Sequence, residues 1–241
     1  MILITGATSG LGLHTSRYLI DMGYQVAGLG RNMEVLEQMA ETYGKKFIPI
    51  QADLLKFENY DDYTASISQL TGIVFCAGIT CKAPARFIQV DKHLEIIDIN
   101  INSPLLLLSS ILRKKKLLNG SSVVFIASSA GVNSGFNGLT SYAASKASII
   151  GAVRCLAVEL ARKQIRVNAI APAGLKIGMI SDENDKQVST QQLLAAEKKS
   201  YLLFNDFIDP DMVSGPIEFL LSKTSSAITG QIITVCGGNT L

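Results

Sequence analysis

The feature that most constrains the fold is an alternation of short apolar segments with longer segments of helical period. Seven segments of strand length are rich in Ile and Val, as is typical of parallel strands buried on both faces. They span residues 1–5, 25–29, 46–51, 72–76, 122–127, 166–171 and 231–236. Helical patterns occupy residues 11–22, 32–43, 92–118, 142–163 and 209–221. This order predicts an α/β fold, a doubly wound parallel sheet of about seven strands with helices on both faces.

Length and composition favour one folded unit. The chain has 241 residues, of which 48% are hydrophobic and 17% charged, which suits a single domain with a full core and argues against disorder. No linker or repeat suggests a second domain. Residues 175–206 break the alternation with a polar stretch after a strand, and we expect them to form a lid over a substrate.

Charge and cysteine content exclude several classes of partner. A formal net charge of +2 gives no reason to expect nucleic acid or a membrane surface. The apolar runs fall short of a membrane span, and residues 1–4 lack the basic flank of a signal peptide. The four cysteines form no Cys-x-x-Cys pair and only two histidines are present, so we expect no metal site. A reducing cytoplasm is the simplest predicted location.

A glycine-rich turn joins the first predicted strand to the first predicted helix. Gly6, Gly10 and Gly12 let the backbone approach a pyrophosphate, while the N-terminus of the helix faces its negative charge. The alternative is a plain tight turn with a packing glycine. Because the turn follows a strand and opens a helix, we predict a dinucleotide site. Its other members are Thr8, Ser9 and Leu11.

Residues after the next strands are predicted to hold the rest of the cofactor. The second strand is followed by Arg31 where enzymes that prefer NAD usually carry an acid, and Arg31 can pair with a 2′-phosphate. The sequence therefore favours NADP(H) over NAD(H), with a solvated surface arginine as the alternative. Asp53, followed by Leu54, can accept a hydrogen bond from the adenine amine or cap a turn. Ala77 and Gly78 are small enough to let the cofactor pass, or form a packing turn.

Three side chains form a candidate proton-transfer site. Ser129 lies thirteen positions before Tyr142, and Lys146 follows Tyr142 by one helical turn. We expect the lysine to lower the pKa of the Tyr142 phenol, so that it acts as acid or base near neutral pH. The Ser129 hydroxyl can donate to the substrate oxygen. Each residue alone is ordinary, so the prediction depends on the joint spacing.

Asn100 is a polar residue inside an apolar helical pattern. It can hold water near Lys146 in a proton relay, or cap its own helix backbone. Asn102 competes for the same role.

Together these residues resemble the classical short-chain dehydrogenase/reductase family over essentially the whole chain. The resemblance implies a single-domain Rossmann-like fold, a catalytic tetrad of Asn100, Ser129, Tyr142 and Lys146, and a nicotinamide cofactor. It also implies that Pro172 and Ala173 contact the cofactor, together with Tyr142 and Lys146. A homotetramer or homodimer built on the helices at 92–118 and 142–163 is a further expectation.

Four positions depart from the family pattern. Cys76 stands where the family usually has Asn, and Ala173 where it usually has Gly. Ile177 replaces a Thr that bonds the cofactor, and Cys236 replaces an acid in the tail.

The substrate remains open at this point. Similar sequences are often 3-oxoacyl-(acyl carrier protein) reductases, and the basic residues at 113–116 and 162–163 can receive an acidic carrier protein. Equally, these residues can simply stabilise the C-termini of their helices, where the helix dipole favours cations. A sugar, a polyol or another ketone is the alternative substrate. The competing classes are an epimerase or dehydratase, which usually needs a longer chain, and an NADP-sensing regulator without turnover.

Overall fold

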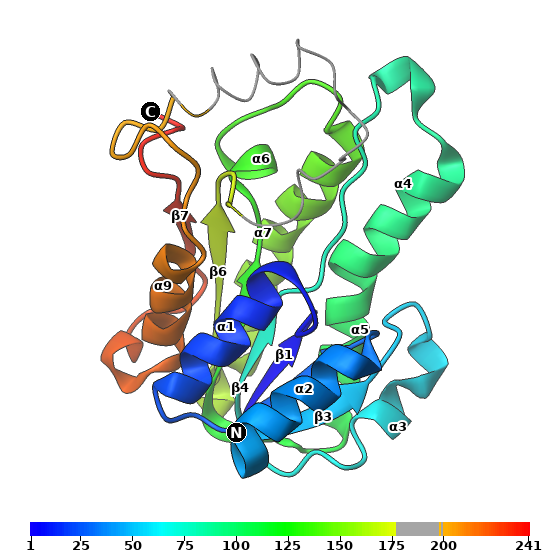
Figure 1. Cartoon of the computed structure of the whole chain (residues 1–241), viewed down its shortest axis with the longest axis vertical. Helices are drawn as coiled ribbons and strands as arrows, with labels where there is room; N and C mark the ends of the chain where they lie inside the picture. Colours follow the sequence, from blue (N-terminus) through cyan, green and yellow to red (C-terminus); the bar gives the residue numbers. More distant parts are fainter. Residues whose placement is uncertain (177–197, 199) are drawn as a thin grey trace.

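The computed structural model describes residues 1–176, 198 and 200–241 (Figure 1). Its centre is a seven-stranded sheet whose paired strands are all parallel, in the order β3-β2-β1-β4-β5-β6-β7. The strands are β1 Ile2–Thr5, β2 Val26–Gly30, β3 Phe47–Gln51, β4 Leu70–Phe75, β5 Leu117–Ile126, β6 Arg166–Pro172 and β7 Ile232–Val235. The predicted parallel sheet is confirmed, and each strand overlaps its predicted segment.

Helices cover both faces of the sheet, as predicted. The longer helices are α1 Gly10–Asp21, α2 Met33–Tyr43, α4 Val90–Ile97, α5 Ser103–Arg113, α7 Thr140–Leu160 and α9 Asp211–Leu221. Two four-residue helices, α3 Tyr60–Tyr63 and α6 Ser129–Val132, were not predicted. In Figure 1, α1, α2 and α9 lie on the near side of the sheet, and α7 lies on the far side.

Successive residues of a strand pack into two separate hydrophobic cores, one on each face of the sheet. In β1, Ile2 and Ile4 pack in the core beneath α1, α2 and α9, whereas Leu3 packs in the core beneath α5 and α7. Strand residues alternate between faces with a period of two. Because both faces are covered, the strands read as continuous apolar runs rather than as alternating ones.

The boundary before β5 differs from the prediction. The helical pattern at 92–118 ends at Arg113, and β5 begins at Leu117 rather than at residue 122. The register between β4 and β5 shifts between Leu70 and Gly72, so β5 starts with an irregular segment. The run of cations at 113–116 conceals this break because its residues are compatible with a helix end.

Residues Val90–Arg113 form a continuous helical run of 24 residues. Its most apolar stretch has a mean hydropathy of 1.3, so by length and composition this run can cross a membrane. Half of that stretch is buried within the fold, and Leu107, Leu108 and Ile111 belong to the core against the sheet. A helix of this kind is long and apolar because it covers a sheet.

The strand order indicates where a ligand would bind. The chain builds β1, β2 and β3 outward on one side, then returns to add β4 on the other side of β1. Ligands bind to such sheets at the carboxyl ends of the strands where the order reverses. Gly6 follows β1 and Ala77 follows β4, and the Ala77 amide donates to the Thr5 hydroxyl at 3.1 Å.

Candidate active site

The glycine-rich turn has the geometry that the sequence predicts. Gly6 and Gly10 have φ of +70° and +51°, a region that favours glycine. At Gly12 the constraint is steric, since a Cβ would lie 2.3 Å from the Gly6 carbonyl oxygen. These glycines hold the turn tightly against the start of α1.

The N-terminus of α1 suits a negatively charged ligand. Ser9 is the N-cap residue, but its side chain makes no capping hydrogen bond, and the first turn contains no acid. The amides of a first helical turn lack intrahelical partners and carry partial positive charge. The turn packs against β2, because a Cβ at Gly30 would lie 2.3 Å from Cγ2 of Thr8. The residues therefore fit a pyrophosphate, and Gly6, Thr8, Ser9, Gly10, Leu11 and Gly12 would hold it.

Arg31 and Asp53 follow adjacent strands at the same edge. Arg31 is exposed immediately after β2. Asp53 uses Oδ1 to accept the Leu55 amide at 3.0 Å, as in the turn-capping alternative, and its own amide donates to the Tyr63 hydroxyl. The turn orients Asp53, and its contact with adenine remains a prediction.

Three segments distant in sequence meet around Tyr142. Ser128 follows β5 in an extended conformation, and its side chain lies close enough to Tyr142 to act on the pKa of the phenol, which it lowers. Tyr142 lies in the first turn of α7, and the ammonium of Lys146 lies 5.9 Å from the centroid of its ring. The structure thus brings the predicted Tyr142 and Lys146 together with a serine, but this serine is Ser128 and not the predicted Ser129.

The serine beside Tyr142 is Ser128, a residue that the sequence reasoning did not single out. Ser129 is its neighbour, 2% exposed, and its carbonyl accepts hydrogen bonds from the amides of Asn133 and Ser134. Ser128 has an extended backbone and Ser129 begins α6, so the two side chains leave the chain in different directions. The sequence feature that could have pointed to Ser128 is the pair of adjacent serines at 128 and 129. A catalytic role for Ser129 stays a prediction, now with Ser128 beside it.

The expected net lowering of the Tyr142 pKa is wrong for this arrangement, because burial dominates. Burial raises the pKa of Tyr142, although the hydrogen bond from Ser128 acts in the opposite direction. Desolvation of a neutral phenol disfavours the phenolate. The tyrosine therefore holds its proton at neutral pH.

Lys146 is itself buried, at 3% exposure. Its ammonium donates to the Ile126 carbonyl at 2.8 Å, which anchors it to the end of β5. Burial lowers the pKa of Lys146 to about 8. Gly78 packs closely against Lys146 and Asn100. A Cβ at Gly78 would lie 3.2 Å from both the Lys146 nitrogen and Oδ1 of Asn100.

Asn100 is distinguished from Asn102 by its contacts. It lies in the π-helical turn Asp98–Asn102, of a kind that often occurs at functional sites. Its Oδ1 accepts the Ile79 amide at 2.9 Å, and its Nδ2 donates to the Ile79 carbonyl and to the Ser145 hydroxyl. Asn102 instead donates to Asp98 in its own helix. Asn100 therefore links the segment after β4 to α7 and does not cap its own helix backbone.

Cys76 lies close to the lysine. Desolvation raises the pKa of the Cys76 thiol to about 12, while the nearby Lys146 charge and a hydrogen bond with Thr15 oppose this. The thiol is therefore neutral and fills the space as a small hydrophobe.

Two other departures from the family pattern, Ala173 and Cys236, lie after β6 and β7. Ala173 follows Pro172 and donates its amide to the Val235 carbonyl at 3.0 Å, which extends the pairing of β6 with β7. Burial raises the pKa of Cys236, but hydrogen bonds from Thr240 and the backbone of Gly238 and Asn239 outweigh it and leave that pKa below its usual value. Ile177 and most of the expected lid at 175–206 lie outside the described residues.

Comparison with known proteins agrees with this geometry. The family model described as "short chain dehydrogenase" matches residues 1–188. The 3-oxoacyl-[acyl-carrier-protein] reductase FabG of Rickettsia bellii is 33% identical over 238 residues, covering 98% of this chain and 95% of that protein.

This chain belongs to the short-chain dehydrogenase family.

Two further relatives show how widely members of the family differ. The 2-dehydro-3-deoxy-D-gluconate 5-dehydrogenase of Escherichia coli is 28% identical, covering 98% of this chain and 93% of that protein. A solved 4-hydroxyisoleucine dehydrogenase mutant, complexed with NADH and succinate, is 25% identical with a TM-score of 0.86 over 99% of this chain and 98% of that one. The chain is therefore an NAD(P)-dependent oxidoreductase acting on CH–OH and C=O groups, and its substrate is not set by likeness alone.

Proposed function

We propose that this enzyme reduces a ketone to an alcohol with NADPH, with Tyr142 as the proton donor. The observation that carries the proposal is the cluster of Ser128, Tyr142, Lys146 and Asn100 around one point. That point lies beside Gly78, at the carboxyl end of β4 where the strand order reverses.

The bound nicotinamide supplies the hydride. Tyr142 holds its proton at neutral pH because burial raises its pKa, so it donates that proton to the carbonyl oxygen as negative charge develops there. The serine hydroxyl donates a hydrogen bond to the same oxygen. The Lys146 ammonium lies near the tyrosine ring and stabilises the phenolate that forms. The reverse reaction uses the same groups, with Tyr142 then acting as the base.

The preference for NADP(H) rests on Arg31. The guanidinium stands after β2 where a ribose-binding acid is absent, and it can pair with a 2′-phosphate. A similar protein, the 4-hydroxyisoleucine dehydrogenase mutant, was solved with NADH, so likeness alone does not decide between the two cofactors.

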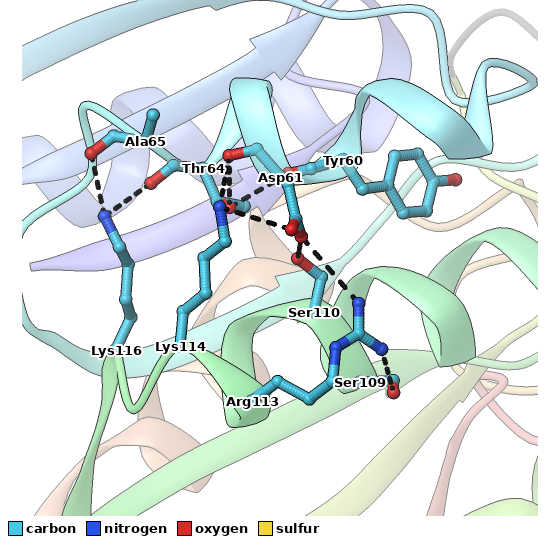
Figure 2. A network of polar contacts seen from close by, with 9 residues as sticks. All are labelled: Tyr60, Asp61, Thr64, Ala65, Ser109, Ser110, Arg113, Lys114 and Lys116. Carbon is cyan, nitrogen blue, oxygen red and sulfur yellow. Dashed lines mark hydrogen bonds and ion pairs between the residues drawn. The ribbon is translucent and has the colours of Figure 1, made fainter.

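A 3-oxoacyl thioester is the first candidate substrate, since several relatives over 30% identical are named 3-oxoacyl-[acyl-carrier-protein] reductases. A carrier protein requires a basic docking surface. Figure 2 shows that most of the cations at 113–116 have partners within the chain. Arg113 and Lys114 lie 3.7 and 3.5 Å from the Asp61 carboxylate. Lys116 donates to the carbonyls of Thr64, Ala65 and Ile67.

Docking of a carrier would therefore fall mainly to Lys115, Arg162 and Lys163. Neutralising these three should raise the KM for a carrier-bound substrate and leave the KM for a small thioester unchanged. An unchanged KM for both would refute the docking role.

A sugar acid is the second candidate, supported by the 2-dehydro-3-deoxy-D-gluconate 5-dehydrogenase relative. NADPH oxidation should be compared for acetoacetyl thioesters, keto sugar acids and neutral ketoses. The highest kcat/KM identifies the substrate class. Absence of turnover with every ketone, while NADPH binds, would overturn the proposed reduction.

We also propose an oligomer formed through α5 and α7, in a cytoplasmic location. Leu106 on α5 is 45% exposed and Val158 on α7 is 79% exposed, and such apolar side chains favour an interface. Light scattering during size-exclusion chromatography separates a monomer from a dimer or tetramer. A Val158→Glu variant should dissociate the assembly.

A further inference from the structure

A cavity of about 160 Å³ lies beside the catalytic helix and is not used by the mechanism above. Its walls come from the segment after β4, from the start of α4 and from the chain that enters α7. The apolar wall includes Phe87, Ile88 and Ile96, and the polar wall includes Lys82, Lys92 and His93. A site with an apolar body and a few polar groups is typical of small-molecule binding.

The polar wall is positively charged. Lys82 is exposed and has no ion-pair partner among the residues that the structure describes. Lys92 pairs with Glu95 at 2.9 Å. His93 shares a hydrogen bond of 2.9 Å with the Ser141 hydroxyl, which leaves its other ring nitrogen for a further contact. No aspartate or glutamate lines the cavity in the described part of the chain. Such a wall suits an anionic oxygen.

Two chain connections tie the cavity to the reactive groups. Ser141 lines the cavity and immediately precedes Tyr142. Cys81 lines it and follows Gly78, which packs against Lys146, by only three residues. Three residues of chain span at most about 10 Å. The cavity wall therefore lies within the length of a small substrate from Gly78.

The loops that enclose the cavity are joined to each other, and a polar atom on the connecting chain is unsatisfied. The Ala83 amide donates to the Gly138 carbonyl at 2.8 Å, which fixes the two loops. Between Gly78 and Cys81, the buried Oγ1 of Thr80 has no hydrogen-bond partner in the described chain. A buried hydroxyl of this kind is costly unless a ligand or water meets it.

We propose that this cavity is a substrate subsite for a carboxylate or phosphate that lies a few bonds from the ketone, with Lys82 as its main cation. The inference rests on the proposed ketone reduction and narrows its substrate to anionic oxo compounds. A carboxylate on a short oxo acid and a phosphate on the arm of a thioester share this chemistry. Their distances from the ketone differ, because the phosphates of an acyl-CoA are separated from it by the whole pantetheine arm.

A homologous series tests the subsite. NADPH oxidation is measured with 3-oxobutanoate, 5-oxohexanoate and 7-oxooctanoate, each beside its methyl ester, and with acetoacetyl-CoA beside acetoacetyl-N-acetylcysteamine. We expect one acid to exceed its ester in kcat/KM by about tenfold or more, as for one charge-assisted hydrogen bond. The chain length at the maximum gives the distance from the ketone to the cation. An advantage confined to acetoacetyl-CoA would assign the subsite to a phosphate.

Variants assign the effect to the cavity. Lys82→Met should raise KM for the preferred acid about tenfold, change kcat little, and leave the ester unaffected. Lys45→Met, which removes an exposed lysine after α2, should change neither. Equal kcat/KM for acids and esters at every length, with no advantage for acetoacetyl-CoA, would overturn the subsite while ester turnover upheld the reductase.

A binding measurement covers the case in which no oxo compound turns over. Calorimetry with 5-oxohexanoate, 7-oxooctanoate and inorganic phosphate on the NADPH-loaded enzyme should show binding that Lys82→Met weakens about tenfold. Binding that is unchanged in Lys82→Met, or absent in the wild type, would overturn the subsite independently of the proposed reduction.

Discussion

The cofactor turn and the catalytic cluster are built in different ways. The turn at 6–12 is mainly local: its shape follows from left-handed glycines and from the close approach of Gly12 to Gly6, while contacts with β2 hold it in place. The cluster joins the end of β5, the first turns of α7 and a π-helical turn after α4, and it depends on long-range contacts. A local motif can be recognised from residue types alone. A cluster requires the direction of each side chain, and here that decided between two adjacent serines.

The largest difference in kcat should be between the Ser128→Ala and Ser129→Ala variants. Ser128→Ala removes the hydroxyl that contacts Tyr142, so kcat for ketone reduction should fall roughly 100-fold to 1000-fold, as for the loss of one oxyanion donor. Ser129→Ala should cost less than tenfold. Steady-state kinetics on both variants makes the comparison. The opposite ranking would return the role to Ser129.

A side chain at Gly12 in the cofactor turn should weaken NADPH binding for a steric reason. Gly12→Ala places a Cβ 2.3 Å from the Gly6 oxygen and should weaken NADPH binding roughly 10-fold to 100-fold, through about 1–3 kcal/mol of strain. Gly215→Ala, in α9, meets nothing closer than the Tyr18 hydroxyl at 3.6 Å and serves as its control. Fluorescence titration of NADPH measures both. Equal affinity in the two variants would show that the close approach is not needed.

The long-range cluster should also depend on Asn100 for stability. Asn100→Ala leaves the Ile79 amide and carbonyl without their side-chain partner, which should cost about 1–3 kcal/mol in the free energy of unfolding. Asn102→Ala breaks only a contact within its own helix and should cost under about 0.5 kcal/mol. Urea denaturation ranks the two. Similar losses would mean that the bridge to Ile79 contributes little.

The smallest effect is expected for the substitution of Arg31, which tests the preference for NADPH over NADH. Arg31→Ala should weaken NADPH binding by about tenfold, the range of one charge-assisted hydrogen bond, and leave NADH nearly unchanged. Arg17→Ala, which removes an exposed arginine on α1, controls for charge. Equal losses for both cofactors would remove the basis for NADPH preference.

Much of the fold was predictable because strand and helix periods are local properties. All seven strands were located, since each is a buried apolar run. The start of β5 was missed because its first residues pair irregularly with β4. Short helices such as α3 were missed because four residues carry no periodicity.

The spacing of Tyr142 and Lys146 in the candidate site was predictable, but the electrostatics of the site and the choice between Ser128 and Ser129 were not. The spacing of Tyr142 and Lys146 places both near one another, yet the pKa of Tyr142 depends on burial, which the sequence does not show. Asn100 and Asn102 are two residues apart and chemically identical. Only the tertiary contact with Ile79 separates them.

The proposed NADPH-dependent ketone reduction depends above all on Tyr142 as the proton donor. The most direct test measures NADPH oxidation and NADPH affinity together for wild type and Tyr142→Phe, with an acetoacetyl thioester and with the best substrate of the oxo-acid series. We expect the variant to bind NADPH with unchanged affinity and to lose at least roughly 100-fold in kcat, as for removal of a general acid. Turnover retained by Tyr142→Phe would contradict it.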